Sequence, residues 1–258
     1  MSDQSPRLTW RDGAIPVSTR FDDPYFSLEN GLNETRHVFL DGNRLDGRLC
    51  DGFHVAELGF GSGLNLLALW QAWDASGQSG RFRFTSFEAF PMSATEMRRA
   101  HEAFPELAPW AARLQAAWEE DPSLAGLDGV EAQIIIGDAR ETLKTQDWQA
   151  DAWFLDGFSP AKNPELWDQA LMADVAVHTK PGGSFATYTA AGFVRRGLEA
   201  AGFAVERIAG YGRKRHIVSA QNRRSRHDCK SAWHSADVSD HLCFCDAGRD
   251  FALSGRTI

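Results

Sequence analysis

The chain has 258 residues, of which 43% are hydrophobic and 24% charged, and this composition excludes a chain that is mostly disordered. Taken alone, a net charge of −8 argues against a nucleic-acid partner, because phosphate binding requires lysine and arginine. That average conceals a basic zone, since residues 192–230 contain 10 basic and 3 acidic side chains, whereas residues 1–191 contain 15 basic and 28 acidic ones. The net charge therefore does not exclude a nucleic-acid partner that contacts the basic zone.

Neither a targeting segment nor a membrane-spanning segment is evident in the sequence. No apolar segment follows the N-terminal MSDQSPRLTWRDG. The sequence also contains no run of about 18 apolar residues, which is the length that a helix needs to span a bilayer. Four cysteines in the whole chain argue against a disulfide framework, so we expect a cytoplasmic protein that does not contact a membrane. The C-x-C spacing of Cys243 and Cys245 differs from the usual C-x-x-C knuckle, and we expect no metal site.

Short apolar segments recur along the chain with helical segments between them. We predict strands at residues 53–58, 82–87, 132–136, 152–155 and 184–189. Their near-continuous hydrophobicity is typical of strands that are buried on both faces of a parallel sheet. The alternation of strands and helices predicts an open α/β sheet with helices on both faces.

Two helix beginnings and one reversed strand can be predicted as well. The segment LNLLALWQAW at residues 64–73 consists of good helix formers, and Ser93 and Glu96 form a capping-box pattern that opens another helix. Strands predicted at 203–208 and 216–220 are separated by too few residues for a crossover helix. They should form an antiparallel hairpin, so the last strand of the sheet runs in reverse.

The chain divides into three parts. We expect residues 1–52 to form an N-terminal cap segment and residues 53–220 to form a Rossmann-like core. Residues 221–258 are polar and follow neither the helical nor the strand period, so we expect a poorly ordered tail.

A glycine-rich loop follows the first predicted core strand. The residues that we expect to bind a cofactor there are Glu57, Gly59, Phe60, Gly61, Gly63 and Asn65. Alternating glycines let the backbone turn sharply and approach a ligand. A dinucleotide fingerprint would place glycine where Leu64 stands, and the acid at Glu57 would repel a pyrophosphate. An acid at this position suits a ligand with an ammonium group, such as S-adenosyl-L-methionine (SAM).

Two further carboxylates follow the next two predicted strands. Glu88 can accept hydrogen bonds from both ribose hydroxyls of such a ligand, and Asp138 can hold its adenine amino group. One acid after each of three successive strands, behind the glycine loop, favours a SAM site. The alternative is an ordinary turn between strand and helix with incidental acids.

The fourth predicted strand ends in DGFSPAKNP, at residues 156–164. Ligands of open α/β sheets lie beyond the carboxyl ends of the strands, so this loop should face the methyl group of SAM. The loop resembles the D-P-P-Y type of amino-group methyltransferases. An amine that donates a hydrogen bond to Asp156 keeps its lone pair free for displacement at the methyl carbon. We expect Asp156 to orient the amine first and to accept a proton second, and Phe158 to pack on the substrate base or shield the methyl group; an ordinary turn is the alternative.

Longer motifs extend this pattern over residues 8–220. They include DPYFSLENGLNETRHVFL at 23–40, FEAFP at 87–91, WFLDGFSPAKNP at 153–164 and AGFVRRGL at 191–198. Together they resemble the methyltransferase domain of MnmC, a bifunctional enzyme that modifies the wobble uridine of tRNA, and its standalone relatives. The resemblance implies a class I SAM-dependent methyltransferase fold, with a Rossmann-like seven-stranded sheet whose last strand is reversed.

The resemblance also implies an activity. It is SAM-dependent methylation of the aminomethyl group of 5-aminomethyl-2-thiouridine at the tRNA wobble position, which gives 5-methylaminomethyl-2-thiouridine. The sequence has no counterpart of the FAD oxidase half, so we expect no oxidase activity and a separate oxidase as a partner on the same uridine. A different amine substrate and a noncatalytic nucleotide- or RNA-binding module are the alternatives.

The resemblance gives weight to two further groups of residues. Candidates to line the cofactor or base pocket are Tyr25, Phe26, Asn30 and Glu34, although this segment can also be a capping helix packed on the sheet. Candidates to contact the tRNA anticodon stem-loop are Lys162, Arg195, Arg213, Lys214 and Arg215. For the arginines and Lys214 the alternative is a solvated helix face and hairpin tip.

Overall fold

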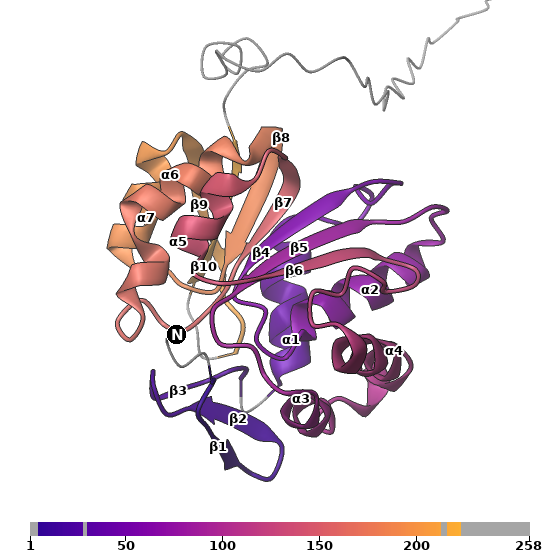
Figure 1. Cartoon of the computed structure of the whole chain (residues 1–258). Helices are drawn as coiled ribbons and strands as arrows, with labels where there is room; N and C mark the ends of the chain where they lie inside the picture. The colour runs from indigo at the N-terminus through magenta and orange to yellow at the C-terminus, as the bar shows by residue number, and fades with distance from the viewer. Residues whose placement is uncertain (1–4, 28–29, 213–215, 223–258) are drawn as a thin grey trace, which may run out of the picture.

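The computed structural model describes residues 5–27, 30–212 and 216–222. A seven-stranded sheet with helices on both faces forms its centre (Figure 1). The strands of this sheet are β4 (His54–Leu58), β5 (Arg83–Glu88), β6 (Glu131–Ile136), β7 (Ala150–Leu155), β8 (Thr179–Thr187), β9 (Phe203–Ala209) and β10 (His216–Asn222). Every strand that we predicted is present, with ends that shift by a few residues.

The sheet order is β6-β5-β4-β7-β8-β10-β9, and β10 is antiparallel to both of its neighbours. This confirms the predicted parallel sheet with a reversed last strand. The register places Leu58 of β4 opposite Phe87 of β5 and Leu155 of β7. The carboxyl ends of three strands are therefore level, so the residues that follow them can share one site.

Two groups of helices cover the sheet, one on each face (Figure 1). The helices are α1 (Gly31–Thr35), η1 (Arg36–Asp41), α2 (Leu64–Ser76), α3 (Ala94–His101), η2 (Pro105–Leu107), α4 (Ala108–Glu120), α5 (Ala139–Thr142), η3 (Leu143–Thr145), η4 (Pro164–Trp167), α6 (Gln169–Val177) and α7 (Gly192–Ala200). One buried cluster joins α2, α3 and α4 to the sheet through residues such as Trp70 and Phe84. A second cluster joins α6 and α7 to the opposite face through Trp167 and Phe185.

The predicted capping box begins α3. The Ser93 hydroxyl accepts a hydrogen bond from the Glu96 amide at 3.3 Å, and the Glu96 carboxylate accepts one from the Ser93 amide at 2.8 Å. Two amide groups at the helix start, which have no partner within the helix, are satisfied in this way.

The N-terminal segment has more strand than we expected. It contains a three-stranded antiparallel sheet of β1 (Leu8–Arg11), β2 (Ile15–Ser18) and β3 (Asp23–Pro24), followed by α1 and η1. Each strand has four residues or fewer, which is too short for a clear alternating pattern. The helical alternative for residues 20–40 is therefore correct only for the part that follows Asn30.

The boundary expected at residue 220 lies two residues too early, because β10 continues to Asn222. The Asn222 side-chain amide donates to the Thr179 carbonyl at 3.0 Å and ties this end of β10 to β8. Residues 223–258, with Cys243 and Cys245, and the segment 213–215 lie outside the described residues. In the part of the chain that the structure describes, no helix combines the length and apolar character that crossing a membrane requires.

His54, at the start of β4, gives a prediction about stability. Its side chain is 2% exposed, and its Nε2 lies 2.9 Å from the Thr85 hydroxyl. Burial, with a smaller effect from Arg83, lowers the pKa of His54 to about 4. The unfolded imidazole has a pKa near 6.5, so between these values only the unfolded chain binds the proton. This contribution to stability is fully present above about pH 6.5 and is lost as the pH falls toward 4.

We expect wild type to lose roughly 3 kcal/mol of unfolding free energy from this group between pH 7 and pH 4. Between pH 7 and pH 4, the unfolding free energy of His54→Gln should fall by roughly 3 kcal/mol less than that of wild type. Denaturant unfolding of both proteins at several pH values checks this, and the difference between them cancels the contributions of other groups. Equal pH dependence in the two proteins would show that His54 does not titrate as described.

Candidate active site

A cavity of about 880 Å³ lies at the carboxyl ends of β4, β5, β6 and β7. Its walls also include the N-terminal segment and the end of β8. The predicted site residues that line it are Tyr25, Phe26, Glu34, Gly59, Phe60, Gly61, Asn65, Glu88, Asp138, Asp156 and Phe158. Residues far apart in the sequence therefore meet in one place, as the level strand ends require.

The glycine loop approaches the loop after β7 closely. Gly59 has a φ of +83°, and a Cβ atom built on it would lie 3.2 Å from the Gly157 Cα atom. Gly61 has a φ of +55°, and a Cβ atom there would lie 3.0 Å from the Tyr25 ring. Only glycine leaves this backbone open to a ligand without strain.

Glu88 joins the end of β5 to the glycine loop. Its carboxylate accepts hydrogen bonds from the Gly61 amide at 2.8 Å and the Phe90 amide at 2.7 Å. Burial raises the pKa of Glu88, although these amide bonds oppose the shift. Each carboxylate oxygen can accept a second hydrogen bond, so Glu88 can bind two ligand hydroxyls while it holds the loop.

Asp138 forms a bidentate pair with a residue that we did not predict, Arg140. The Arg140 Nε atom lies 3.0 Å from Oδ1 of Asp138, and its Nη2 atom lies 2.5 Å from Oδ2. Hydrogen bonds from Arg140 hold the pKa of Asp138 below its usual value. Both residues line the cavity, so a ligand that meets Asp138 also meets the guanidinium group.

A chain of buried polar groups leads to Asp156. The Asn65 side-chain amide donates to Oδ2 of Asp156 and to Oε1 of Glu57, each at 2.8 Å. The Ser86 hydroxyl donates to the other Glu57 oxygen at 2.6 Å, and the Gly157 amide donates to Oδ1 of Asp156 at 2.8 Å. The orientation of the Asp156 carboxylate is therefore fixed before any ligand binds.

Glu57 has a different place from the one we expected. It is completely buried and does not line the cavity, and each of its carboxylate oxygens accepts a hydrogen bond. Burial raises the pKa of Glu57 well above its usual value. The Asn65 side chain lies between Glu57 and Asp156 and donates a hydrogen bond to each of them. Glu57 holds Asn65 in position.

Several other predicted residues also lie outside the cavity lining. Gly63 is the N-cap residue of α2, and the Asn30 side chain accepts a hydrogen bond from the Asn33 amide at 3.0 Å to begin α1. Lys162 pairs with two aspartates, and Arg195 lies 3.5 Å from Glu199 along α7. Predicted residues outside the described part of the chain are Arg213, Lys214 and Arg215.

Aromatic side chains form one wall of the cavity. Phe158 stacks on Phe21, with ring centroids 4.7 Å apart and an interplanar angle of 24°, and meets Tyr25 edge-on at 4.9 Å. Phe90 lies 5.9 Å from Phe21, and the Arg20 guanidinium lies 4.2 Å above the Phe90 ring. Phe158 and Tyr25 were predicted, whereas Arg20, Phe21 and Phe90 were not; Phe90 lies two residues after the end of β5, and Arg20 and Phe21 follow no strand of the central sheet.

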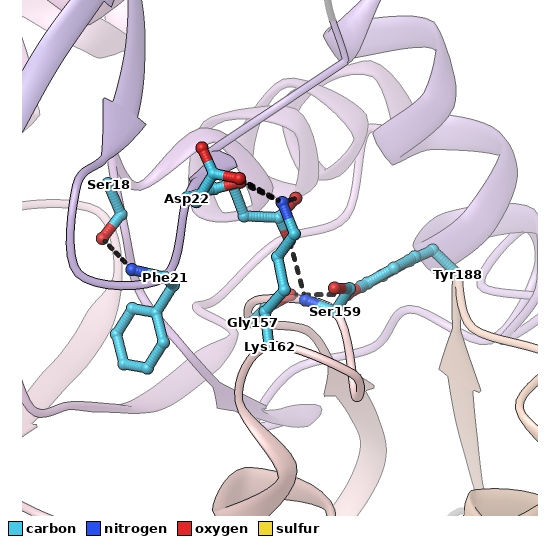
Figure 2. Close-up of polar contacts among 8 residues, drawn as sticks. Ser18, Phe21, Asp22, Gly157, Ser159, Lys162 and Tyr188 are labelled. Atoms are coloured by element: carbon cyan, nitrogen blue, oxygen red, sulfur yellow. Dashed lines mark hydrogen bonds and ion pairs between the residues drawn. The ribbon is translucent and has the colours of Figure 1, made fainter.

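Tyr188 is another cavity residue that we did not predict. Its hydroxyl donates to the Gly157 carbonyl at 2.8 Å, and burial raises its pKa (Figure 2). Tyr188 follows the last residue of β8. The rule that ligand-binding residues follow the carboxyl ends of strands, applied to this strand as well, would have found it.

Comparisons with known proteins agree with this geometry. A family model described as S-adenosyl-L-methionine-dependent methyltransferase matches residues 105–223. The crystal structure of MNMC2 from Aquifex aeolicus is 27% identical, with a TM-score of 0.63, over 80% of this chain and 66% of that one. SAM-bound CalS10, an amino pentose methyltransferase from Micromonospora echinaspora, is 13% identical, with a TM-score of 0.45, over 76% and 92% of the two chains.

The sheet order, the glycine loop and the family model define a class I SAM-dependent methyltransferase, and SAM is its methyl donor. Within this class the chain is similar to MNMC2 from Aquifex aeolicus, in agreement with the resemblance of its motifs. The chain spans just under two thirds of the Aquifex protein. The described residues fit SAM, because the glycine loop, Glu88 and Asp138 line one cavity.

The close contact of Gly59 with the loop after β7 gives a second prediction. Gly59→Ala should weaken SAM binding and turnover by at least about tenfold each, because the added methyl group meets backbone that cannot rotate away. Gly77→Ala is the control: Gly77 also has a positive φ, of +66°, but a Cβ atom there meets nothing within 4 Å. Calorimetric SAM titration and initial rates check both variants. If Gly59→Ala behaves like Gly77→Ala, the close approach does not matter for function.

Proposed function

We propose that this methyltransferase transfers a methyl group to the aminomethyl nitrogen of 5-aminomethyl-2-thiouridine at the wobble position of tRNA. The product is 5-methylaminomethyl-2-thiouridine. The observation that supports this most directly is the position of Asp156, whose carboxylate is held in the cavity next to the glycine loop. The similarity to MNMC2 supports the choice of substrate.

Asp156 has the properties that an amine substrate requires. When bound, SAM supplies a methyl group that is electrophilic because it is attached to a sulfonium. An amine that donates one hydrogen bond to Asp156 has its lone pair free, and the fixed carboxylate determines where that lone pair points. We assign Asp156 the orientation of the amine as its first role and acceptance of a proton as its second.

The aromatic wall fits a nucleobase substrate. Phe21, Phe90 and Phe158 line the same cavity as Asp156. Stacking of a base on an aromatic side chain contributes about 1–3 kcal/mol and requires no particular base. Arg20 also lines the cavity and adds a positive charge beside the wall, where a nucleotide phosphate could lie.

Methyl transfer to two matched tRNA preparations tests this proposal. They should differ only in whether the wobble uridine has the aminomethyl group, and SAM with a labelled methyl group is the donor. We expect label in the tRNA with the aminomethyl base and none above background in the other. Equal labelling of both would reject the proposed substrate. A cytoplasmic location, where tRNA is modified, and a separate oxidase that acts on the same uridine belong to this proposal.

The basic residues between β9 and β10 give a third prediction. Tyr211 and Gly212, which precede them in the chain, line the cavity. Reversing the charges of residues 213–215 should lower tRNA affinity at least about tenfold. The slope of the logarithm of the binding constant against the logarithm of the salt concentration should become shallower by about 0.9 for each phosphate that is no longer neutralised. Arg81→Glu is the control, because Arg81 is an exposed residue before β5, which lies in the other half of the sheet from β9 and β10. Unchanged affinity and salt dependence after the triple reversal would exclude this segment from tRNA binding.

A further inference from the structure

The loop after β7, residues 156–164, is fastened to the turn between β2 and β3. The Ser159 amide donates to Oδ2 of Asp23 at 2.8 Å. The Lys162 ammonium donates to the Asp22 carbonyl (Figure 2). It also lies 3.6 Å from Oδ1 of Asp23. We call Asp23, Ser159 and Lys162 the loop clasp. This explains why Lys162, which we expected to contact substrate, does not line the cavity.

The two aspartates of the turn contribute unequally. The Asp23 side chain is 21% exposed and accepts a loop amide, whereas the Asp22 side chain is 95% exposed and lies 3.3 Å from Lys162. A hydrogen bond to a charged acceptor is about twice as strong as a neutral one, and exposed ion pairs contribute little. Asp23 is therefore the side chain that ties the loop to the N-terminal sheet.

The loop clasp acts on the segment that contains both proposed catalytic residues. Ser159 directly follows Phe158, and the Phe158 ring stacks on Phe21, which belongs to the same turn as Asp23. The Phe158 carbonyl accepts a hydrogen bond from the Trp167 indole at 2.9 Å. The Trp167 contact joins the loop to η4, the helix that follows it, whereas the loop clasp joins the loop to the N-terminal sheet.

We propose that Asp23 is a positioning residue, which through the Ser159 amide fixes where Asp156 and Phe158 meet the substrate. This inference rests on the proposed function. Asp23 precedes the region that the family model matches, and its sheet is separate from the seven-stranded one. In this proposal the N-terminal sheet contributes the Asp23 side chain to the active site. A displacement of about 1 Å can lower a rate by as much as a hundredfold, so this one contact can matter for turnover.

Three variants of the whole chain test the inference. Asp23→Ala should lower kcat about tenfold with little change in the KM for SAM, because Asp23 lines the cavity beside Phe158 and the hydrogen bonds of Glu88 to the glycine loop are kept. Asp23→Asn should recover most of the rate, since its amide oxygen can still accept the Ser159 N–H. Asp22→Asn, which removes the neighbouring and more exposed charge, is the matched control, and asparagine tolerates the positive φ of +49° there.

Hydrogen exchange of the loop gives a readout that does not depend on the substrate. Amides of residues 157–159, 161 and 162 should exchange faster in Asp23→Ala than in wild type and Asp22→Asn, with unchanged SAM affinity. The inference is overturned if Asp23→Ala matches wild type in exchange or in kcat, or if Asp23→Asn is as slow as Asp23→Ala. If wild type methylates no tRNA, the proposed function is rejected, and exchange still decides whether Asp23 holds the loop.

Discussion

Asp156→Ala is expected to lower kcat at least about a hundredfold, whereas the Kd for SAM should change less than about threefold. In the proposed reaction the carboxylate orients the amine and accepts its proton, and alanine can do neither. The glycine loop and Glu88, which form the proposed cofactor end of the cavity, keep their own hydrogen bonds in this variant. Single-turnover rates with tRNA and calorimetric SAM titrations measure the two quantities separately.

Two further variants make the Asp156 test specific. Asp156→Asn keeps the shape of the side chain but removes its charge, and it should be nearly as slow as Asp156→Ala. Asp147→Asn removes a charge from an exposed position before β7 and should match wild type. A fully active Asp156→Ala would contradict the role proposed for this residue.

Glu88→Ala is expected to raise the Kd for SAM about a hundredfold, which corresponds to roughly 2.7 kcal/mol of binding free energy. The variant leaves the amides of Gly61 and Phe90 without the acceptor that holds them. It also removes the two lone pairs proposed to bind the ligand hydroxyls. Unpaired amides cost about 1–3 kcal/mol each when they are buried, so the glycine loop should lose its fixed shape as well.

Calorimetric titration of Glu88→Ala with SAM measures this loss directly. Glu88→Gln keeps one carbonyl acceptor and should bind with intermediate affinity. Glu131→Ala is the control, since Glu131 is an exposed carboxylate at the amino end of the neighbouring strand β6. An unchanged Kd in Glu88→Ala would show that this carboxylate does not contribute to cofactor binding.

The central sheet could be predicted because its inner strands, such as β4, β5 and β7, are buried on both faces. Such strands appear in the sequence as apolar segments, and the short gap before β10 identified the reversed strand. The N-terminal sheet could not be predicted in this way. Its strands β1 to β3 have four residues or fewer, and they are stabilised by pairing and by contacts with distant segments.

The predicted site residues that line the cavity are mainly those next to strand ends. Glu88, Asp138 and Asp156 each follow or end a strand, so their common location could be inferred from topology alone. Contacts between residues from distant parts of the chain could not be inferred in this way. The pairing of Lys162 with Asp22 spans 140 residues, and the burial of Glu57 beneath Asn65 depends on how α2 packs on the sheet.

The most direct test of the central claim is nucleoside analysis after one turnover. Wild type and Asp156→Ala are each incubated with SAM and with tRNA that has 5-aminomethyl-2-thiouridine at the wobble position. The tRNA is then digested to nucleosides, which are identified by mass. Wild type should convert this nucleoside to 5-methylaminomethyl-2-thiouridine, with one methyl group on the amine, and Asp156→Ala should leave it unchanged. An unmodified nucleoside with wild type, or a methyl group at another atom, would contradict the proposed function.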